Sequence, residues 1–276
     1  MLRRTLGSAL LLLLTAAAIF WKGAAGLVWL LAILALGAQV ELVRLVQRLS
    51  PRVEIIRWQL YGWTVAIILG AWYLGPLYGG IWLSLLALLA SVFRGVATSH
   101  PSLLLHRLLP TVLCLLYVPF ALQFAVLLLR CEPDTTSGIW LLAWVVCVCK
   151  CSDIGGLLAG VTCGRHSLAR EYSPSKTWEG FFGGLLLSLG GGTVLWSLGR
   201  SLGHLTSLSL RLALALSTTL AVIATVSDLL ESAIKRQARV KNSGCSIPGI
   251  GGCLDLCDSL ILSLPTAYAV FQLAGR

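Results

Sequence analysis

The side chains of this sequence that could do chemistry gather in one stretch, residues 227–258, which reads SDLLESAIKRQARVKNSGCSIPGIGGCLDLCD. Helical spacing over residues 227–241 predicts an amphipathic helix, because the polar side chains fall on one stripe and the apolar side chains largely opposite. The polar stripe consists of Asp228, Glu231, Ser232, Lys235 and Arg239. So much charge in an otherwise apolar sequence needs a physical cause.

A glycine-rich loop and two aspartates follow this predicted helix. Residues 243–252 contain four glycines and Pro248, a composition that excludes a regular element and leaves backbone N–H groups free to face an anion. Asp255 and Asp258 are three residues apart, so we expect them on one helix face at the start of the last apolar run. If the loop reverses the chain, Asp228 meets this pair. Three converging carboxylates repel one another unless a cation lies among them, which predicts a Mg²⁺ site that holds a polyphosphate.

The same pattern also has a purely structural interpretation. A charged amphipathic helix followed by a glycine turn is common on the cytoplasmic side of membrane proteins, and two aspartates at this spacing are a weak signal alone. Their position favours function, however. Asp255 and Asp258 lie at the mouth of an apolar run, where a carboxylate is costly unless it is partnered or used.

A second polar position lies earlier in the chain. Ser152 and Asp153 interrupt an apolar run that is long enough to cross a membrane. An aspartate at this depth indicates a functional site, and Lys150 and Lys176 are its two candidate neighbours.

The polar loop at residues 173–180 leads into a glycine-containing apolar run. It predicts an ordinary helix start, with Ser175 or Thr177 as the N-cap and Glu179 in the first turn. Lys176 adds positive charge where the helix dipole is already positive. This choice disfavours stability but favours the binding of phosphate.

Both segments resemble the CDP-diacylglycerol synthases, or phosphatidate cytidylyltransferases. The signature of that family runs Ser-x-x-Lys-Arg, Lys-Asp, Pro-x-His-Gly-Gly and Asp-Arg-x-Asp. It is matched in order and spacing by Ser232, Lys235, Arg236, Lys241, Pro248, Gly251, Gly252, Asp255 and Asp258. An earlier family pattern, Asp-x-Gly and then Ser-Pro-x-Lys-Thr-Trp-Glu-Gly, is matched by Asp153, Gly155, Ser173, Pro174, Lys176, Thr177, Trp178, Glu179 and Gly180.

The chain departs from the family signature at three positions. Asn242 stands where the family has Asp, Ile250 where it has His, and Leu256 where it has Arg. The carboxylates that could bind a metal ion are kept, whereas three ionisable side chains of the signature are missing. Ile250 and Leu256 replace two groups that are able to bind phosphate or move protons, so their loss bears on activity.

The resemblance implies transfer of a cytidylyl group from CTP to phosphatidate, which gives CDP-diacylglycerol and pyrophosphate in phospholipid biosynthesis. Mg²⁺, with or without a second cation, is the implied cofactor. The implied metal ligands are Asp228, Asp255 and Asp258, and Lys235 completes the predicted catalytic set. The predicted substrate-binding residues are Asp153, Ser173, Lys176, Ser232, Arg236, Lys241, Gly251 and Gly252.

The composition of the whole chain is that of a polytopic membrane protein. Of its 276 residues, 57% are hydrophobic and 12% are charged, and the mean hydropathy is +0.88. These values lie far outside the range of soluble domains. We predict an all-α polytopic membrane protein with about nine transmembrane helices. Apolar runs mark these helices near residues 5–21, 24–43, 59–75, 77–93, 108–129, 138–160, 180–199, 208–226 and 259–274.

The basic residues indicate the orientation of these helices. With a cytoplasmic N-terminus, most of the 21 lysines and arginines fall on the inner side, as the positive-inside rule requires. The first apolar run resembles a cleaved signal peptide, but we interpret it as a retained span because the later segments are also hydrophobic. Residues 227–258 then face the cytoplasm from the cell (inner) membrane, where nucleoside triphosphates are within reach.

Two regions with different roles are predicted. Residues 1–130 offer little chemistry and are expected to form a scaffold of transmembrane helices, whereas residues 131–276 form the catalytic region. The net charge of +10 is spread over short loops, which favours attraction to anionic lipid headgroups over nucleic-acid binding. We therefore expect CTP, phosphatidate and membrane lipid as partners, and no nucleic acid.

Two other functions remain open at this point. The missing ionisable side chains are also compatible with a divergent, non-catalytic homologue that binds lipid or partners an active synthase. A related membrane transferase or kinase that acts on another lipid is the second alternative. The sequence leaves the oligomeric state open, with a homodimer among the expected assemblies.

Overall fold

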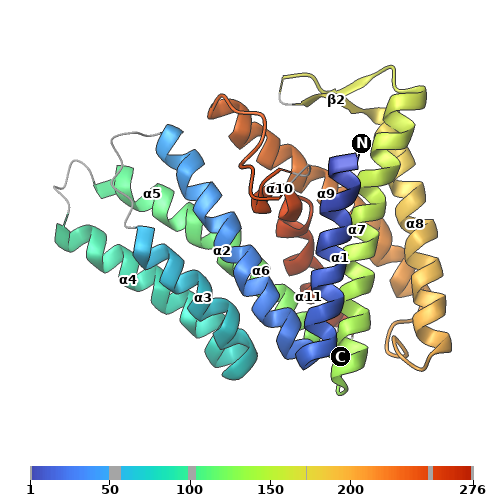
Figure 1. Ribbon diagram of the computed structural model, residues 1–276, viewed down its shortest axis with the longest axis horizontal. Helices are drawn as coiled ribbons and strands as arrows, with labels where there is room; N and C mark the ends of the chain where they lie inside the picture. The colour runs from blue at the N-terminus through green and yellow to red at the C-terminus, as the bar shows by residue number, and fades with distance from the viewer. Residues whose placement is uncertain (1, 50–56, 99–103, 172, 248–250, 275–276) are drawn as a thin grey trace. The chain divides into compact units, whose positions relative to one another are not determined.

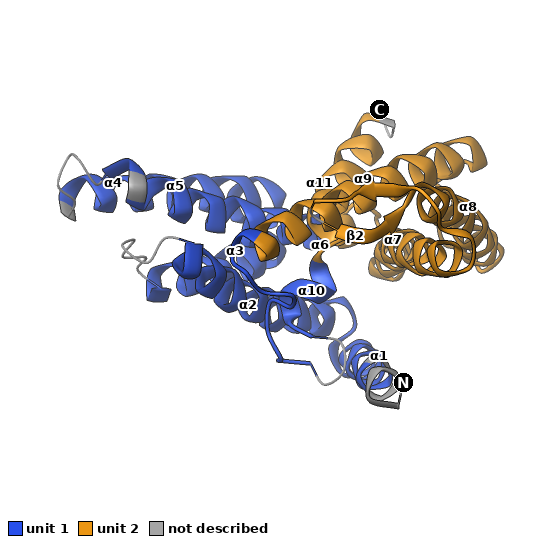
Figure 2. Cartoon of the chain, turned by 90° about the horizontal axis from the view of Figure 1, so that it is seen from above, with its two compact units in different colours: residues 1–127, 237–257 blue, residues 128–236, 258–276 orange. Residues whose placement is uncertain are grey.

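The computed structural model describes residues 2–49, 57–98, 104–171, 173–247 and 251–274. These segments are almost entirely helical, apart from two short strands. The chain forms two compact units, shown in different colours in Figure 2. Unit 1 consists of residues 1–127 and 237–257, and unit 2 consists of residues 128–236 and 258–276.

Unit 1 is a bundle of helices in which chain neighbours pack against one another. Helix α1 packs on α2, α2 packs on α3, and α4 packs on α5 (Figure 1). The short helix α10 comes from the far end of the sequence and also packs on α2. The helices are α1 (Leu2–Lys22), α2 (Ala24–Leu49), α3 (Arg57–Tyr73), η1 (Pro76–Trp82), α4 (Leu83–Thr98), α5 (Leu104–Leu115), η3 (Leu116–Phe120), α6 (Ala121–Leu129) and α10 (Cys253–Cys257).

Unit 2 is built around the close pairing of α7 (Thr135–Cys163) with α8 (Trp178–Ser201), which run side by side in Figure 1. Small residues allow this approach: a Cβ atom added at Gly155 of α7 would lie 2.5 Å from the carbonyl oxygen of Gly183 in α8. Small residues at such positions permit close contact between two helices. The remaining helices of unit 2 are α9 (Leu210–Gln237) and α11 (Leu260–Ala274).

A small hairpin connects α7 to α8. Strand β1 (Ser167–Ala169) pairs antiparallel with β2 (Ser173–Thr177), and Ser167 lies opposite Thr177. The sequence predicts only a polar loop here. Strand β2 ends directly before the N-terminus of α8, and its residues are held by backbone pairing with β1.

The prediction of an all-α polytopic membrane protein is confirmed. Within the described segments, seven helices are long and apolar enough to cross a membrane. Each of the nine predicted apolar runs coincides with helical structure. Two of these helices are shorter than the seven candidate spans: the apolar part of α1 covers Ala9–Lys22, and α3 has 17 residues. The exact number of crossings and the side of the N-terminus stay predictions.

Two predicted helices end differently in the structure. Helix α9 ends at Gln237 rather than at Lys241, because the chain turns there and Arg239 takes a positive φ of 55°. The last helix is also interrupted: α10 ends at Cys257, and turn residues separate it from α11. The prediction that Asp255 and Asp258 share one face of a continuous helix is therefore wrong.

Candidate active site

Three carboxylates come together in unit 2 and are called here the acidic triad: Asp228, Glu231 and Asp258. One oxygen atom of each lies within 4.8 Å of the others. Asp228 and Glu231 are one helical turn apart on α9, and Asp258 precedes α11. The predicted meeting of Asp228 with Asp258 is thus present, and Glu231 is a third member that the sequence placed on the polar stripe without a role.

The acidic triad forms because the polar stripe of α9 faces inward. Ser227 and Glu231 are buried, with Glu231 only 1% exposed, whereas Val226 and Leu230 are 51% and 43% exposed. This pattern suits a helix whose apolar face meets lipid. The hydroxyl of Ser227 donates to the backbone carbonyl of Asp258, which fixes the turn before α11 against α9.

Each member of the acidic triad has a lysine beside it. Lys176 of β2 lies 2.6 Å from Asp228, and Lys235 of α9 lies 3.3 Å from Glu231. Lys150 of α7 lies 3.7 Å from Asp258. Charges inside a membrane span are costly unless they are paired, so the lysines stabilise the carboxylates in this arrangement.

Lys150 also holds Asp153, which lies one turn further along α7. The Nζ atom of Lys150 is 3.1 Å from the Oδ2 atom of Asp153 and 2.9 Å from the hydroxyl of Ser259. The same hydroxyl is 3.0 Å from Asp153 Oδ2. Of the two neighbours that the sequence proposed for Asp153, Lys150 is therefore confirmed.

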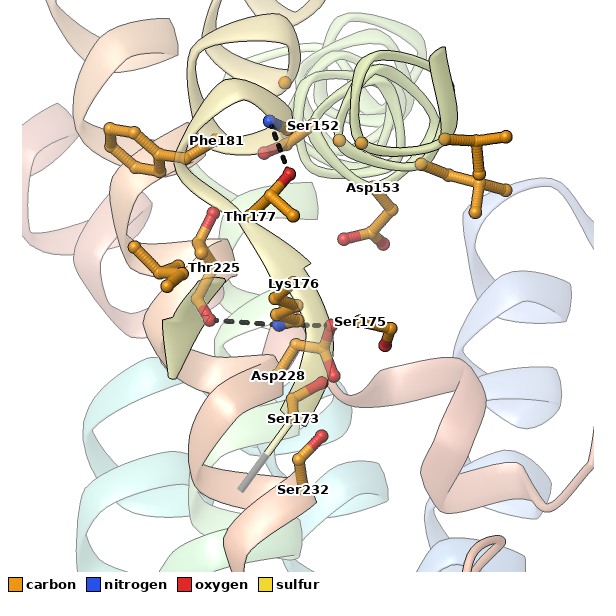
Figure 3. Close-up of a pocket in the computed structure, with 17 residues that line it drawn as sticks. Ser152, Asp153, Ser173, Ser175, Lys176, Thr177, Phe181, Thr225, Asp228 and Ser232 are labelled. Carbon is orange, nitrogen blue, oxygen red and sulfur yellow. Dashed lines mark hydrogen bonds and ion pairs between the residues drawn. The ribbon is translucent and has the colours of Figure 1, made fainter. Parts of the chain in front are cut away.

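A cavity of about 370 Å³ lies beside Asp228 in unit 2 (Figure 3). Its apolar lining includes Leu157, Val161 and Phe181. Figure 3 shows Lys176 within it, joined to Asp228 and to the backbone oxygen of Thr225. Five predicted site residues line this cavity: Asp153, Ser173, Lys176, Asp228 and Ser232. Because charged and apolar side chains both line this cavity, it suits a ligand with both characters.

The helix start at α8 confirms the capping prediction. Thr177 is the N-cap, and its hydroxyl accepts a hydrogen bond from the backbone N–H of Gly180 at 3.1 Å. Glu179 in the first turn accepts from the backbone N–H groups of Arg165 and His166. These contacts fix the end of the hairpin and therefore the backbone position of Lys176.

The remaining predicted residues divide between the two units. Arg236 lies with Lys235 in the last turn of α9, in unit 2. Four others belong to unit 1: Lys241, Gly251, Gly252 and Asp255. Of the departures from the family signature, Asn242 and Leu256 also lie in unit 1, and Ile250 lies outside the described residues.

Asp255 has a local role in unit 1. Its carboxylate accepts hydrogen bonds from the backbone N–H of Ser243 at 3.2 Å and from that of Gly252 at 2.8 Å. Gly251 has a φ of 128°, a conformation that favours glycine, and its N–H donates to the carbonyl of Ile247. In the described part of the loop, these N–H groups therefore already have acceptors within the chain.

A second carboxylate, which was not among the predicted site residues, holds the same loop. Glu41 of α2 is 1% exposed and accepts hydrogen bonds from two hydroxyls, Ser243 at 2.9 Å and Ser246 at 2.6 Å. It also accepts from the backbone N–H groups of Cys253 at 3.1 Å and Leu254 at 2.9 Å. A signal was present, because Glu41 is the single acidic residue in the apolar run at residues 24–43.

Two further residues of the site were also missed. Glu231 joins the acidic triad, and its spacing from Asp228 placed both on one helix face. Ser259 bridges Lys150 and Asp153, although nothing in its sequence context distinguishes it from a packing serine.

The donor set of the acidic triad fits a divalent cation. It offers three carboxylates with oxygen atoms close enough to share one ion, and hard oxygen ligands are those that Mg²⁺ prefers. Their mutual repulsion would be relieved by such an ion.

The sequence is similar to those of known proteins. The sequence model of the cytidylyltransferase family matches residues 3–274. A phosphatidate cytidylyltransferase of Thermotoga maritima is 31% identical over 198 residues, which cover 69% of each chain. A phosphatidate cytidylyltransferase of Chlamydia muridarum is 35% identical over 161 residues, 57% of this chain and 52% of that protein. One of Mycobacterium leprae is 33% identical over 163 residues, 59% of this chain and 49% of that protein.

In the last two comparisons the matched segment spans about half the length of the relative. The resemblance to CDP-diacylglycerol synthases is confirmed by the family match along the chain and by the names of these relatives. The chain belongs to the cytidylyltransferase family.

Proposed function

We propose that this protein transfers the cytidylyl group of CTP to phosphatidate, forming CDP-diacylglycerol and releasing pyrophosphate. The observation that carries the proposal is the acidic triad, each member beside a lysine, next to a cavity lined by both polar and apolar side chains. Membership of the cytidylyltransferase family and relatives named phosphatidate cytidylyltransferases support it.

The chemistry asks the protein mainly for alignment and charge neutralisation. The phosphate of phosphatidate is itself the nucleophile, so no side chain has to generate one. The oxygen that attacks must be brought in line with the α-phosphorus of CTP, which is a matter of positioning. A site rich in fixed charges and poor in mobile water suits this task.

Asp228, Glu231 and Asp258 would hold Mg²⁺, which when bound neutralises the phosphate charge of CTP during displacement. Asp255 was also predicted as a ligand and stays in the proposal as a candidate, as does a second cation. Asp255 lies in α10, which ends at Cys257, directly before Asp258.

The lysines and serines of the site would bind phosphate oxygens. Lys176 and Lys235 each lie beside a carboxylate. Each can exchange it for a phosphate oxygen, because an ammonium group pairs with either anion. Ser173 and Ser232 line the same cavity and can donate hydrogen bonds to the phosphate. Arg236 and Lys241 are the further predicted contacts. The apolar side chains of Leu157 and Phe181 in the cavity lining suit the lipid part of phosphatidate.

The location follows from the apolar helices. The protein is a membrane protein, and we place it in the cell (inner) membrane with the site on the cytoplasmic side, where CTP is available. The basic residues on the predicted inner segments support this orientation.

The mass of the detergent-solubilised protein, measured by light scattering, tests the predicted homodimer.

The direct test uses the purified full chain in lipid nanodiscs with radiolabelled CTP, phosphatidate and Mg²⁺. We expect labelled CDP-diacylglycerol and a stoichiometric release of pyrophosphate. A parallel reaction with diacylglycerol in place of phosphatidate identifies a lipid kinase or another transferase. Wild-type protein that makes no more labelled product than the Asp258→Asn variant would contradict the proposal and favour a non-catalytic role.

A further inference from the structure

Lys150 is a charged residue in the middle of a long apolar helix. It lies on α7, which is a candidate membrane span, and its side chain is 32% exposed. An ionisable residue at such a position is costly, so its contacts deserve a functional explanation. The family signature does not include this position.

The contacts of Lys150 converge on the turn that carries Asp258. Its ammonium group, the hydroxyl of Ser259 and the carboxylate of Asp153 form a closed triangle with sides of 2.9, 3.0 and 3.1 Å. Ser259 is fully buried and directly follows Asp258. Lys150 therefore holds the residue next to Asp258 and, at 3.7 Å, contacts the carboxylate of Asp258 itself.

Asp258 needs such a hold more than its partners in the acidic triad. Asp228 and Glu231 lie within the regular helix α9, whereas Asp258 lies in the turn between α10 and α11. Its carboxylate faces two other carboxylates, which repel it. The family signature has an arginine two residues before this aspartate, and here Leu256 takes that place.

We propose that Lys150 is a positioning residue for Asp258: its ammonium group, anchored by Asp153 and Ser259, fixes the Asp258 carboxylate in the orientation that a divalent cation needs. This proposal rests on the proposed function, because it takes Asp258 as a ligand of the cation. Asp153 then acts on Asp258 indirectly, because it holds Lys150. Partners of this kind that orient a ligand typically contribute about tenfold to a hundredfold in metal affinity or activity.

A simple counter-charge would behave in the opposite way. If Lys150 only balanced the negative charge of the acidic triad, its removal would leave the carboxylates more attractive to a cation, and metal binding would become tighter. If Lys150 positions Asp258, its removal weakens metal binding in spite of the gain in negative charge. The sign of the change therefore separates the two roles.

The experiment measures Mn²⁺ binding by electron paramagnetic resonance, with the full chain in nanodiscs and no substrate. We expect Lys150→Met to weaken Mn²⁺ binding about tenfold to a hundredfold, and Lys150→Arg to restore most of it. Lys22→Met, the same change at an exposed position in unit 1, should have no effect. Mn²⁺ binding by Lys150→Met that equals or exceeds the wild-type affinity would overturn the proposal.

A second variant covers the case in which Lys150→Met does not fold. Ser259→Ala removes one corner of the triangle without changing any charge, so we expect a smaller loss of Mn²⁺ affinity in the same direction. Unchanged affinity in Ser259→Ala would count against the proposal.

The test separates this proposal from the proposed function. Mn²⁺ binding needs no turnover, so a wild-type protein that binds Mn²⁺ but makes no CDP-lipid would refute the proposed function alone. Wild-type binding that does not depend on Asp258, shown with Asp258→Asn, would refute the role of Lys150 even if the protein were an active synthase. In an active enzyme, the activity lost in Lys150→Met should shrink as the Mg²⁺ concentration rises.

Discussion

Glu41 in unit 1 and the acidic triad in unit 2 are two solutions to one problem, a carboxylate on a membrane-spanning helix. Glu41 and Glu231 are equally buried, at 1% exposure each. Glu41 accepts four hydrogen bonds from hydroxyls and backbone N–H groups, which carry no charge. Glu231 has Lys235 beside it, and its neighbours in the acidic triad have Lys176 and Lys150.

The difference indicates which carboxylate is held permanently by the fold and which has partners that can exchange it for another anion. Backbone N–H groups are part of the fold, so the anion that they hold is fixed once the chain has folded. An ammonium group on a flexible stem can leave a carboxylate and bind a phosphate instead. Burial alone therefore does not distinguish the two kinds of carboxylate in this protein, whereas the chemical nature of their partners does.

The largest effect is expected from the acidic triad. Asp228→Asn and Asp258→Asn each remove a proposed ligand of a cation that stabilises the transition state by several kcal/mol, so transfer activity should fall on the order of a thousandfold. The thermal midpoint should change little. The measurement is the CDP-diacylglycerol assay on protein whose folding is checked by size-exclusion chromatography, and activity within a factor of a few of wild type would contradict the assignment.

Glu41→Ala should act on the fold. The change removes the acceptor of two buried backbone N–H groups, those of Cys253 and Leu254, and each buried group left unsatisfied costs about 1–3 kcal/mol. We expect a large fall in the thermal midpoint, with activity lost only in proportion to the unfolded fraction. Differential scanning fluorimetry in detergent measures it; normal stability together with lost activity would show that Glu41 belongs to the chemistry.

Lys176→Met should weaken substrate binding without harming the fold. A hydrogen bond to a charged group contributes about 1.5–3 kcal/mol, so the KM for CTP or for phosphatidate should rise roughly tenfold to a hundredfold. Arg170→Met, on an exposed position of the same hairpin, is the matched control. Equal kinetic constants for the two variants would remove Lys176 from the site.

The smallest effect concerns Asp255, which resembles Glu41 in its partners. Asp255→Asn weakens hydrogen bonds from two backbone N–H groups, so stability should fall by about 1 kcal/mol. Mn²⁺ titration of the same variant tests the predicted ligand role separately. No change in the thermal midpoint would show that these hydrogen bonds are not what holds Asp255.

Patterns that are local in sequence could be predicted. Apolar runs longer than a membrane is thick mark the helices without reference to the rest of the chain. The cap at Thr177 and the pair of Lys150 with Asp153 also depend on neighbours a few residues away. The same holds for the inward stripe of α9, which carries Asp228 and Glu231.

Features that depend on distant residues could not be predicted. Glu41 and its partners Ser243 and Cys253 are separated by about two hundred residues, and no local pattern joins them. Asp255 and Asp258 were expected on one helix face, but the chain turns at Asp258, where Ser259 and the Asp258 carbonyl are held by α7 and α9. Contacts of this kind exist only after the chain has folded.

One matched pair tests the central claim most directly: Glu231→Gln against Glu41→Gln, the same change at two equally buried glutamates. The measurement is CDP-diacylglycerol formed per folded molecule in nanodiscs containing phosphatidate, with saturating CTP and Mg²⁺. We expect Glu231→Gln to lose transfer almost completely and Glu41→Gln to keep it. Equal activity in the two variants, or loss only in Glu41→Gln, would contradict the assignment of the chemistry to the acidic triad.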